Sequence, residues 1–108
     1  MRAELRQSAA DLNPYIAMAT ALAAGLHGIE SALELPEETK GDATACESDL
    51  HLPQTLHEAT EKLKASDVAK QLLGEPFVDH YVRTREWEVR QARKAVTDWE
   101  LARYFESV

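Results

Sequence analysis

The hydrophobic pattern of the first third of the chain predicts one long helix that has no polar face. Large apolar residues recur at steps of three and four between Tyr15 and Leu33, a spacing that places them on one side of an α-helix. The opposite side, which includes Ala17 and Ala21, is also uncharged until Glu30. A helix that is apolar all round requires burial on every side. We therefore expect this chain to self-associate if nothing else covers the helix.

The ends of this helix are marked by two proline signals. Asn13-Pro14 predicts the start, because Asn can accept hydrogen bonds from the first free N–H groups and Pro lacks the N–H that would be unpaired. Leu35-Pro36 predicts the end. Residues 36–54 are rich in Pro, Gly, Asp, Glu and Thr and show little periodicity, so they are interpreted as a loop.

The second half of the chain predicts four further helices. Thr55-Leu56-His57-Glu58 fits a capping box, with Leu56, Ala59 and Leu63 expected to point inward. Ser66 or Asp67 begins another short helix that Gly74 closes with a left-handed cap. Glu75-Pro76 opens a longer helix over residues 76–95, and the second capping box, Thr97-Asp98-Trp99-Glu100, begins a terminal helix. The predicted fold class is therefore mainly α.

The composition indicates which classes of partner and which cellular compartment to expect. The chain has 108 residues and a net charge of −7, which allows one small domain and disfavours nucleic acid as a partner. The single cysteine, Cys46, cannot form an internal disulfide, and there is no signal-peptide pattern, so a cytoplasmic setting is expected. The uncharged stretch Leu12–Leu26 is shorter than the roughly 20 apolar residues of a membrane span, so no membrane contact is expected.

Most candidate chemical motifs have a structural explanation. His57-Glu58 begins like the zinc motif H-E-x-x-H, but Glu61 stands where the second His is required. The basic run in the helix at 76–95 is interrupted by Glu86 and Glu88, and Glu86 with Arg90 forms an i,i+4 pair of the favourable order. These residues are interpreted as a solvated helix face. The two tryptophans are interpreted as core or docking anchors.

Glu4 and Arg6 are the remaining candidates. If this segment is extended, period-two alternation places both side chains on one face. A carboxylate and a guanidinium that point the same way suit a site for a metal ion and an acidic substrate, although two charges near a chain end are more often simply solvated.

The surrounding sequence resembles the end of the catalytic domain of the glutamine synthetase family. Glu4-Leu5-Arg6, Asn13-Pro14-Tyr15 and the run from Ala21 to Ile29 are similar to the family pattern E-x-R, N-P-Y and A-G-x-x-G-I. The similarity continues in order through the segments Leu52-Pro53, Gly74-Glu75, Phe77-Val78, Val96–Glu100 and Tyr104-Phe105. The ending also resembles the γ-glutamylpolyamine synthetase branch.

The resemblance implies an ATP-dependent ligase. The family joins the γ-carboxylate of glutamate to ammonia or an amine through γ-glutamyl phosphate, with Mg²⁺ or Mn²⁺ as the divalent ion. By position, Glu4 matches a metal-binding glutamate and Arg6 matches the arginine that holds the substrate carboxylate. The implied partners are glutamate, ATP and ammonia or an amine, and a homo-oligomer is expected. The resemblance assigns no catalytic residue and no ATP-binding residue within this chain.

The chain also departs from the family pattern. The other metal ligands, the ATP-binding residues and the N-terminal domain all lie upstream of the matched segment. We therefore expect residues 1–108 to be the C-terminal, mainly α part of an α/β catalytic domain, inactive by itself. Gly41-Asp42-Ala43 replaces the Gly-Asn-Ala-Tyr-like run of the family. The alternative is a stand-alone helical protein-interaction module that binds a partner through residues 76–95, although it leaves the N-P-Y block unexplained.

Overall fold

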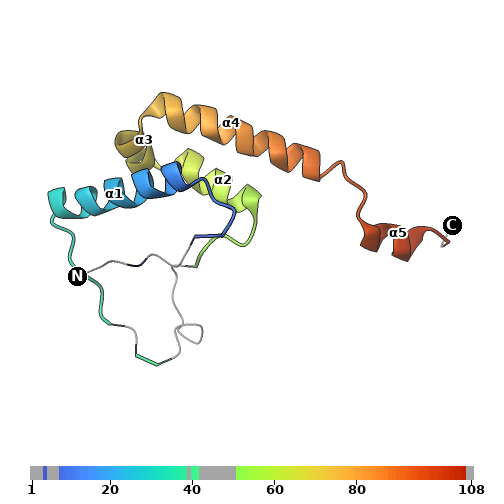
Figure 1. The fold of residues 1–108 in the computed structure, drawn as a ribbon, viewed down its shortest axis with the longest axis horizontal. Coiled ribbons are helices and arrows are strands. Elements are labelled where there is room, and N and C mark those ends of the chain that lie inside the picture. Colours follow the sequence, from blue (N-terminus) through green and yellow to red (C-terminus); the bar gives the residue numbers. More distant parts are fainter. Residues whose placement is uncertain (1–3, 5–7, 39, 42–50, 107–108) are drawn as a thin grey trace.

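The computed structural model describes residues 4, 8–38, 40–41 and 51–106. Over these residues the regular structure consists of five α-helices and no strand: α1 (Pro14–Glu30), α2 (Leu56–Ala65), α3 (Asp67–Leu73), α4 (Glu75–Ala92) and α5 (Asp98–Tyr104) (Figure 1). The prediction of a mainly α chain is confirmed. The predicted extended pair Glu4–Arg6 cannot be compared with the structure, because Arg6 lies outside the described residues.

The start of α1 agrees with the sequence, whereas its end does not. The Asn13 side chain accepts hydrogen bonds from the backbone N–H groups of Tyr15 and Ile16 at 3.0 and 3.3 Å. The predicted end at Leu35 is wrong, because the helix stops at Glu30. Ala32 adopts a positive φ of 47°. This turn lets the Leu33 N–H donate to the Gly28 carbonyl at 3.0 Å and closes the helix with a Schellman-type end.

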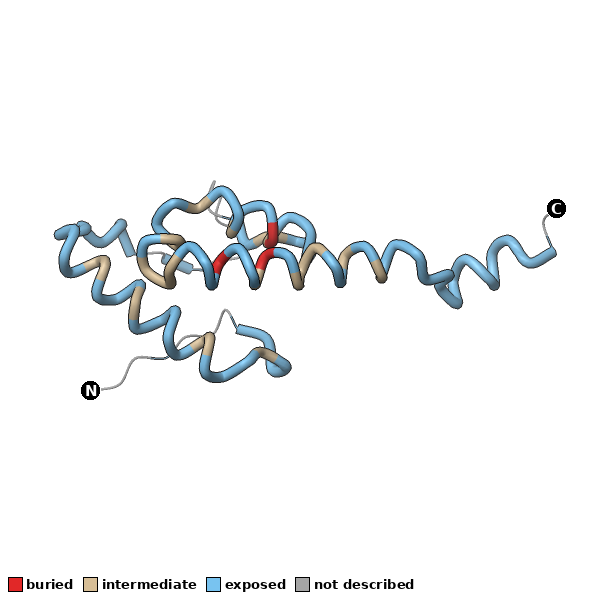
Figure 2. Tube along the Cα trace, turned by 90° about the horizontal axis from the view of Figure 1, so that it is seen from above, coloured by how far each residue is buried: buried red, intermediate tan, exposed pale blue. Residues whose placement is uncertain are grey.

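The small core lies where α4 packs on α2 and α3. Val78 and Val82 of α4 are buried, as is Thr60 of α2, and Figure 2 shows these few buried positions close together on neighbouring helices. The Thr60 hydroxyl is satisfied inside its own helix, because it donates to the Leu56 carbonyl at 2.6 Å. Leu56 was predicted to point inward but is exposed, and Thr60 takes the buried position of α2.

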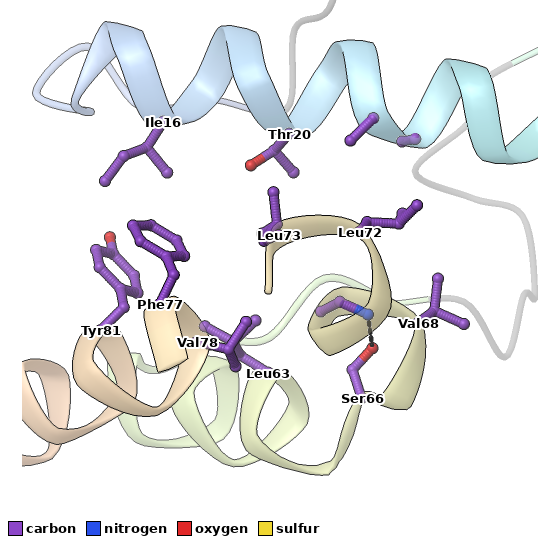
Figure 3. Close-up of a pocket in the computed structure, with 13 residues that line it drawn as sticks. Ile16, Thr20, Leu63, Ser66, Val68, Leu72, Leu73, Phe77, Val78 and Tyr81 are labelled. Carbon is purple, nitrogen blue, oxygen red and sulfur yellow. Dashed lines mark hydrogen bonds between the residues drawn. The ribbon is translucent and has the colours of Figure 1, made fainter. Parts of the chain in front are cut away.

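Helix α1 packs on α3 with the face opposite to the one that its apolar pattern emphasises. Ile16 and Thr20 point toward the side chains of α3 and α4, as Figure 3 shows. The larger apolar side chains lie on the other side of α1 and are exposed; these are Tyr15, Met18, Leu22, Leu26 and Ile29. Among the described residues, α1 is therefore covered on one face only.

The helix caps of the second half follow the sequence with one difference. At α5 both halves of the capping box form: the Thr97 hydroxyl oxygen accepts from the Glu100 N–H, and the Thr97 N–H donates to the Glu100 carboxylate. At α2, Thr55 accepts from the Glu58 N–H, but the Glu58 carboxylate accepts from the Gln54 N–H at 2.8 Å. The second half of that box is therefore displaced by one residue.

The chain is extended for its size. Its radius of gyration is 18.3 Å, against about 13 Å for a compact domain of this length. Helix α4 runs past the small core, and α5 lies beyond its far end, away from the other helices (Figure 1). Trp87 and Trp99 are both exposed, so neither serves as the core anchor that one interpretation of the sequence allowed.

Gly74 forms the turn between α3 and α4, which otherwise follow one another directly in the sequence. It ends α3 and precedes α4, with φ 87° and ψ 131°, a conformation that a residue with a Cβ adopts only with strain. Its N–H donates to the Lys70 carbonyl at 3.0 Å. A glycine with positive φ is thus confirmed as the end of α3, but the predicted left-handed cap is wrong in detail, because a ψ of 131° lies outside the left-handed helical region. The position of α4 on the core depends on this turn.

We predict that Gly74→Ala destabilises the chain by about 1–2 kcal/mol, because the added Cβ disfavours the positive φ. The matched control is Gly25→Ala in α1, where no atom lies within 4 Å of an added Cβ. That variant should gain roughly 0.5–1 kcal/mol in helix stability. Thermal unfolding followed by far-UV circular dichroism measures both. Equal effects of the two variants would contradict the assigned turn.

Candidate functional site

The predicted site segment, Glu4–Arg6, precedes α1 in the sequence, with seven residues between Arg6 and Pro14. Glu4 is exposed, whereas Arg6, the predicted substrate-binding residue, lies outside the described residues. The two hydrogen bonds of the Asn13 cap and the fixed φ of Pro14 determine where the helix begins. The direction in which the chain enters α1 is therefore set locally, by the N-P-Y block that the sequence singled out.

The described residues do not form a complete metal site. Among them there is no group of three or more His, Cys, Asp or Glu side chains placed to hold one ion. Mg²⁺ requires near-octahedral coordination by oxygen atoms, which one carboxylate such as Glu4 cannot supply. The part of this chain that the structure describes therefore does not fit a divalent ion by itself, and Glu4 can serve only together with ligands from elsewhere.

Two of the described histidines lie in the terminal turns of helices. His27 lies in the last turn of α1, where its Nδ1 lies 3.2 Å from the Ser31 hydroxyl. His57 lies in the first turn of α2, and Glu61, not a second His, follows one turn later. The interpretation of the His-Glu pair as part of a helix start is consistent with this geometry.

A partly enclosed space lies between α1 and the layer formed by α3 and α4. It is a cavity of about 360 Å³. Phe77 and Tyr81, whose rings stack with centroids 5.9 Å apart, lie across it from Ile16 and Thr20 (Figure 3). The other lining residues are Ala23, Ala24, Leu63, Ser66, Val68, Ala69, Leu72, Leu73 and Val78.

This cavity is not suited to glutamate or ATP. None of its lining residues is charged, and the Ser66 hydroxyl oxygen already accepts from the Ala69 N–H at 3.1 Å. A carboxylate or phosphate placed there would lose its hydration without a compensating charge. The Arg85 guanidinium lies over the ring of Tyr81, a lining residue, at 5.3 Å from the centroid, but Arg85 itself does not line the cavity. The cavity is therefore a feature of helix packing and not a catalytic pocket.

An ion pair joins α2 to α4. Lys64 donates to the Glu86 carboxylate at 2.7 Å. This hydrogen bond raises the pKa of Lys64 and lowers the pKa of Glu86. The sequence suggested that Glu86 pairs with Arg90 along one helix, but the described contact of Glu86 is with Lys64, and Arg90 acts on it only through its charge. Sequence spacing could not detect this contact, because the two residues lie on different helices.

The comparisons with known proteins identify the class of chain. The family model described as "Glutamine synthetase, catalytic domain" matches residues 1–104. The helices and the N-P-Y cap described above thus form a helical part of such a catalytic domain. The chain belongs to the glutamine synthetase family, as the resemblance predicted.

Curated relatives agree with the family model. The chain is 44% identical to type-1 glutamine synthetase 2 of Dictyostelium discoideum, over 99% of this chain and 21% of that protein. It is 46% identical to a gamma-glutamylethanolamide synthetase of Streptomyces coelicolor, over 98% of this chain and 23% of that protein. It is 36% identical to a glutamate–isopropylamine ligase of a Pseudomonas species, over 99% of this chain and 24% of that protein. The chain thus spans about a fifth to a quarter of the length of these relatives.

Within the described residues, no helix combines the length and the apolar content needed to cross a membrane.

We predict that Glu86→Gln lowers the thermal midpoint of the chain at neutral pH, because it removes the charged partner of Lys64. The contribution of Glu86 to the free energy of unfolding should be present above its unfolded-state pKa of about 4.3, and it should be lost as pH falls through its lowered native pKa. The contribution of Lys64 should be present below its unfolded-state pKa of about 10.4, and it should be lost as pH rises through its raised native pKa. Both groups are solvated, so added salt should reduce the difference.

Thermal unfolding of wild type and Glu86→Gln across this pH range measures the effect. The matched control is Glu88→Gln, which removes the same charge from another face of α4, since two residues correspond to about 200° of helix rotation. A midpoint difference that stays constant down to strongly acidic pH would contradict the assigned pair.

Proposed function

We propose that residues 1–108 form the C-terminal part of the catalytic domain of an ATP-dependent ligase, with the N-terminal domain and the rest of the catalytic domain contributed by other sequence. In this proposal the enzyme joins the γ-carboxylate of glutamate to ammonia or an amine through γ-glutamyl phosphate. The observation that carries the proposal is the match of residues 1–104 to the glutamine synthetase catalytic domain. The chain's share of its relatives, about a fifth to a quarter, supports the assignment to one part of that domain.

Two residues at the start of the chain are assigned to the site. The Glu4 carboxylate would supply one oxygen ligand to Mg²⁺ or Mn²⁺, and oxygen ligands suit such hard cations. The Arg6 guanidinium would hold a substrate carboxylate, a role that its planar pair of donors fits. Their position supports the assignment, because E-x-R precedes the N-P-Y helix start as in the family pattern. The remaining ligands, and the ATP-binding residues, would come from elsewhere in the enzyme.

The nitrogen substrate is ammonia or a small amine. Relatives of similar identity include a glutamine synthetase, a gamma-glutamylethanolamide synthetase and a glutamate–isopropylamine ligase. The similarity to the two amine-named proteins supports an amine as strongly as ammonia. Polyamines remain a candidate from the resemblance of the C-terminal sequence. We further propose that the enzyme is a homo-oligomer and that it is cytoplasmic. The single cysteine supports the cytoplasmic setting, because disulfides are rare there.

A chimera provides the direct test of this function. It is the Streptomyces coelicolor gamma-glutamylethanolamide synthetase with its matching segment replaced by residues 1–108 of this chain. ATP- and glutamate-dependent formation of a γ-glutamyl amide by the chimera would support the proposal. A folded chimera that forms no such product with ammonia, ethanolamine, isopropylamine or putrescine would contradict it.

We predict that the 108-residue chain alone does not hydrolyse ATP in a glutamate-dependent manner, because Glu4 and Arg6 are the only residues of the inferred site that it contains. Phosphate release is measured with glutamate, Mg²⁺ or Mn²⁺, and the same panel of nitrogen compounds. The unmodified Streptomyces enzyme serves as the positive control. Glutamate-dependent turnover by the isolated chain would show that the site is complete within these residues.

We predict that Arg6→Ala in the chimera raises the KM for glutamate and lowers kcat/KM by roughly ten- to a hundredfold, the effect of losing one charge-assisted hydrogen-bond partner. Arg6→Lys should have a kcat/KM between those of the parent chimera and Arg6→Ala, since lysine keeps the positive charge but loses the paired donors of the guanidinium. Glu4→Ala should weaken the dependence of ATP use on the metal concentration. Arg93→Ala and Glu88→Ala, on or next to α4, are the matched controls. Kinetics of Arg6→Ala and Glu4→Ala that equal those of the controls would remove both residues from the site.

A further inference from the structure

A row of basic residues with a tryptophan among them follows the exposed side of α4. We call it the basic stripe and define it by Arg83, Trp87, Arg90 and Lys94. Their spacing of four, three and four residues places them on one side of a helix, and Lys94 lies two residues beyond the end of α4. All four are exposed, and the Trp87 side chain is 52% exposed. Trp and Arg are the residue types that contribute most to protein–protein contacts, so this surface is suited to bind a partner.

The positive charges of the basic stripe are not used inside the chain. The two ion pairs printed by the geometry of the described residues involve other side chains. The pKa of Glu86 is lowered mainly by its hydrogen bond to Lys64 at 2.7 Å, and the charges of Arg90 and Arg83 add less. The helix dipole favours a cation in the last turn of α4, such as Arg90, but this effect does not reach Arg83, nine residues before the helix end. The stripe is therefore available to an acidic surface.

The segment that begins at the end of α1 has the complementary pattern. Residues 30–38 contain four glutamates, Glu30, Glu34, Glu37 and Glu38, and no Lys, Arg or His. Every residue of this range is exposed, and we call it the acidic segment. Its middle is apolar, since the Leu35 side chain is 95% exposed, and the proline that follows favours extended backbone at this leucine. The acidic segment therefore presents an exposed apolar side chain with carboxylates before and after it.

The two surfaces also agree in length. Arg83 and Arg90 are seven residues apart on a helix, which corresponds to about 10 Å. Glu34 and Glu37 are three residues apart, and extended chain of that length also spans about 10 Å. The tryptophan lies between the two arginines, as the leucine lies between the two glutamates. Two charge pairs and one apolar contact can thus form together.

Within one chain these two surfaces lie apart. Figure 1 shows the chain that follows α1 on the opposite side of the molecule from the projecting half of α4. We propose that the basic stripe of one chain binds the acidic segment of a second copy. The inference rests on the proposed homo-oligomer and names the surfaces of one of its contacts. Because each chain has a net charge of −7, two copies repel one another overall, and local pairing of opposite charges selects this orientation.

Charge reversal in the chimera defined above tests this contact. The stripe variant combines Arg83→Glu with Arg90→Glu, and the segment variant combines Glu34→Lys with Glu37→Lys. Each should increase the dissociated fraction several-fold in sedimentation at a fixed protein concentration, because like charges then face one another. A chimera that carries all four substitutions should regain the mass of the parent, since the charges are exchanged and attract again.

The matched controls make the same changes of charge at exposed positions outside both surfaces. Lys62→Glu with Arg93→Glu is matched to the stripe variant, and Glu61→Lys with Glu88→Lys is matched to the segment variant. Both controls should sediment like the parent. If the stripe and segment variants also sediment like the parent, or if the fourfold variant is as dissociated as the stripe variant, the proposal is wrong.

Cross-linking of the parent chimera gives a second test that does not depend on the folding of any variant. A carbodiimide joins a lysine amine directly to a carboxylate in contact with it, and a mixture of unlabelled chimera and chimera labelled with heavy nitrogen separates links between chains from links within one chain. We expect Lys94 to be linked to the acidic segment, with one partner from each labelled form. Links within one chain only, or no such link, would overturn the proposal. A chimera that assembles as predicted but forms no γ-glutamyl product contradicts only the proposed function.

Discussion

Burial of the two uncharged faces of α1 is the constraint on which the arrangement of the other elements depends. Apolar surface gains about 25 cal/mol for each Å² removed from water, so a helix without a polar face is stable only between two layers. Within this chain, α3 and the start of α4 form one layer, reached through Ile16 and Thr20. Among the described residues, no helix supplies a second layer, and the larger apolar side chains on the other side of α1 are exposed.

This constraint also explains why the core of the chain is small. Val78, Val82 and Thr60 are the only buried residues among those described, and they lie where α4 packs on α2 and α3. The contact is supported at the surface by Lys64 and Glu86. A core of this size contributes little of the free energy that a domain needs to fold alone. The uncharged cavity beside α1 also indicates loose packing, in this case between α1 and the layer formed by α3 and α4.

Local sequence signals predicted the elements well, whereas contacts between elements escaped them. Asn13, Thr97 and Gly74 determine helix boundaries through bonds to near neighbours, so their roles could be recognised from residue type and spacing. The end of α1 was missed because Ala32 takes a conformation that is typical of Gly. The buried Thr60 and the bond between Lys64 and Glu86 depend on which helix lies opposite, which periodicity does not encode. The candidate site was found only through resemblance, because Glu4 and Arg6 carry no distinctive pattern of their own.

The two tryptophans of this chain are natural reporters of its assembly state. Trp87 lies near the end of α4 that projects past the core, and Trp99 lies on α5, where its ring meets Tyr104 edge-on at 6.2 Å. Both indoles are exposed, so water surrounds much of each ring when the chain is alone. Contact with another protein surface at either helix would exchange that water for an apolar environment and shift the fluorescence emission to shorter wavelength. The projecting half of the molecule can thus be monitored optically without any added label.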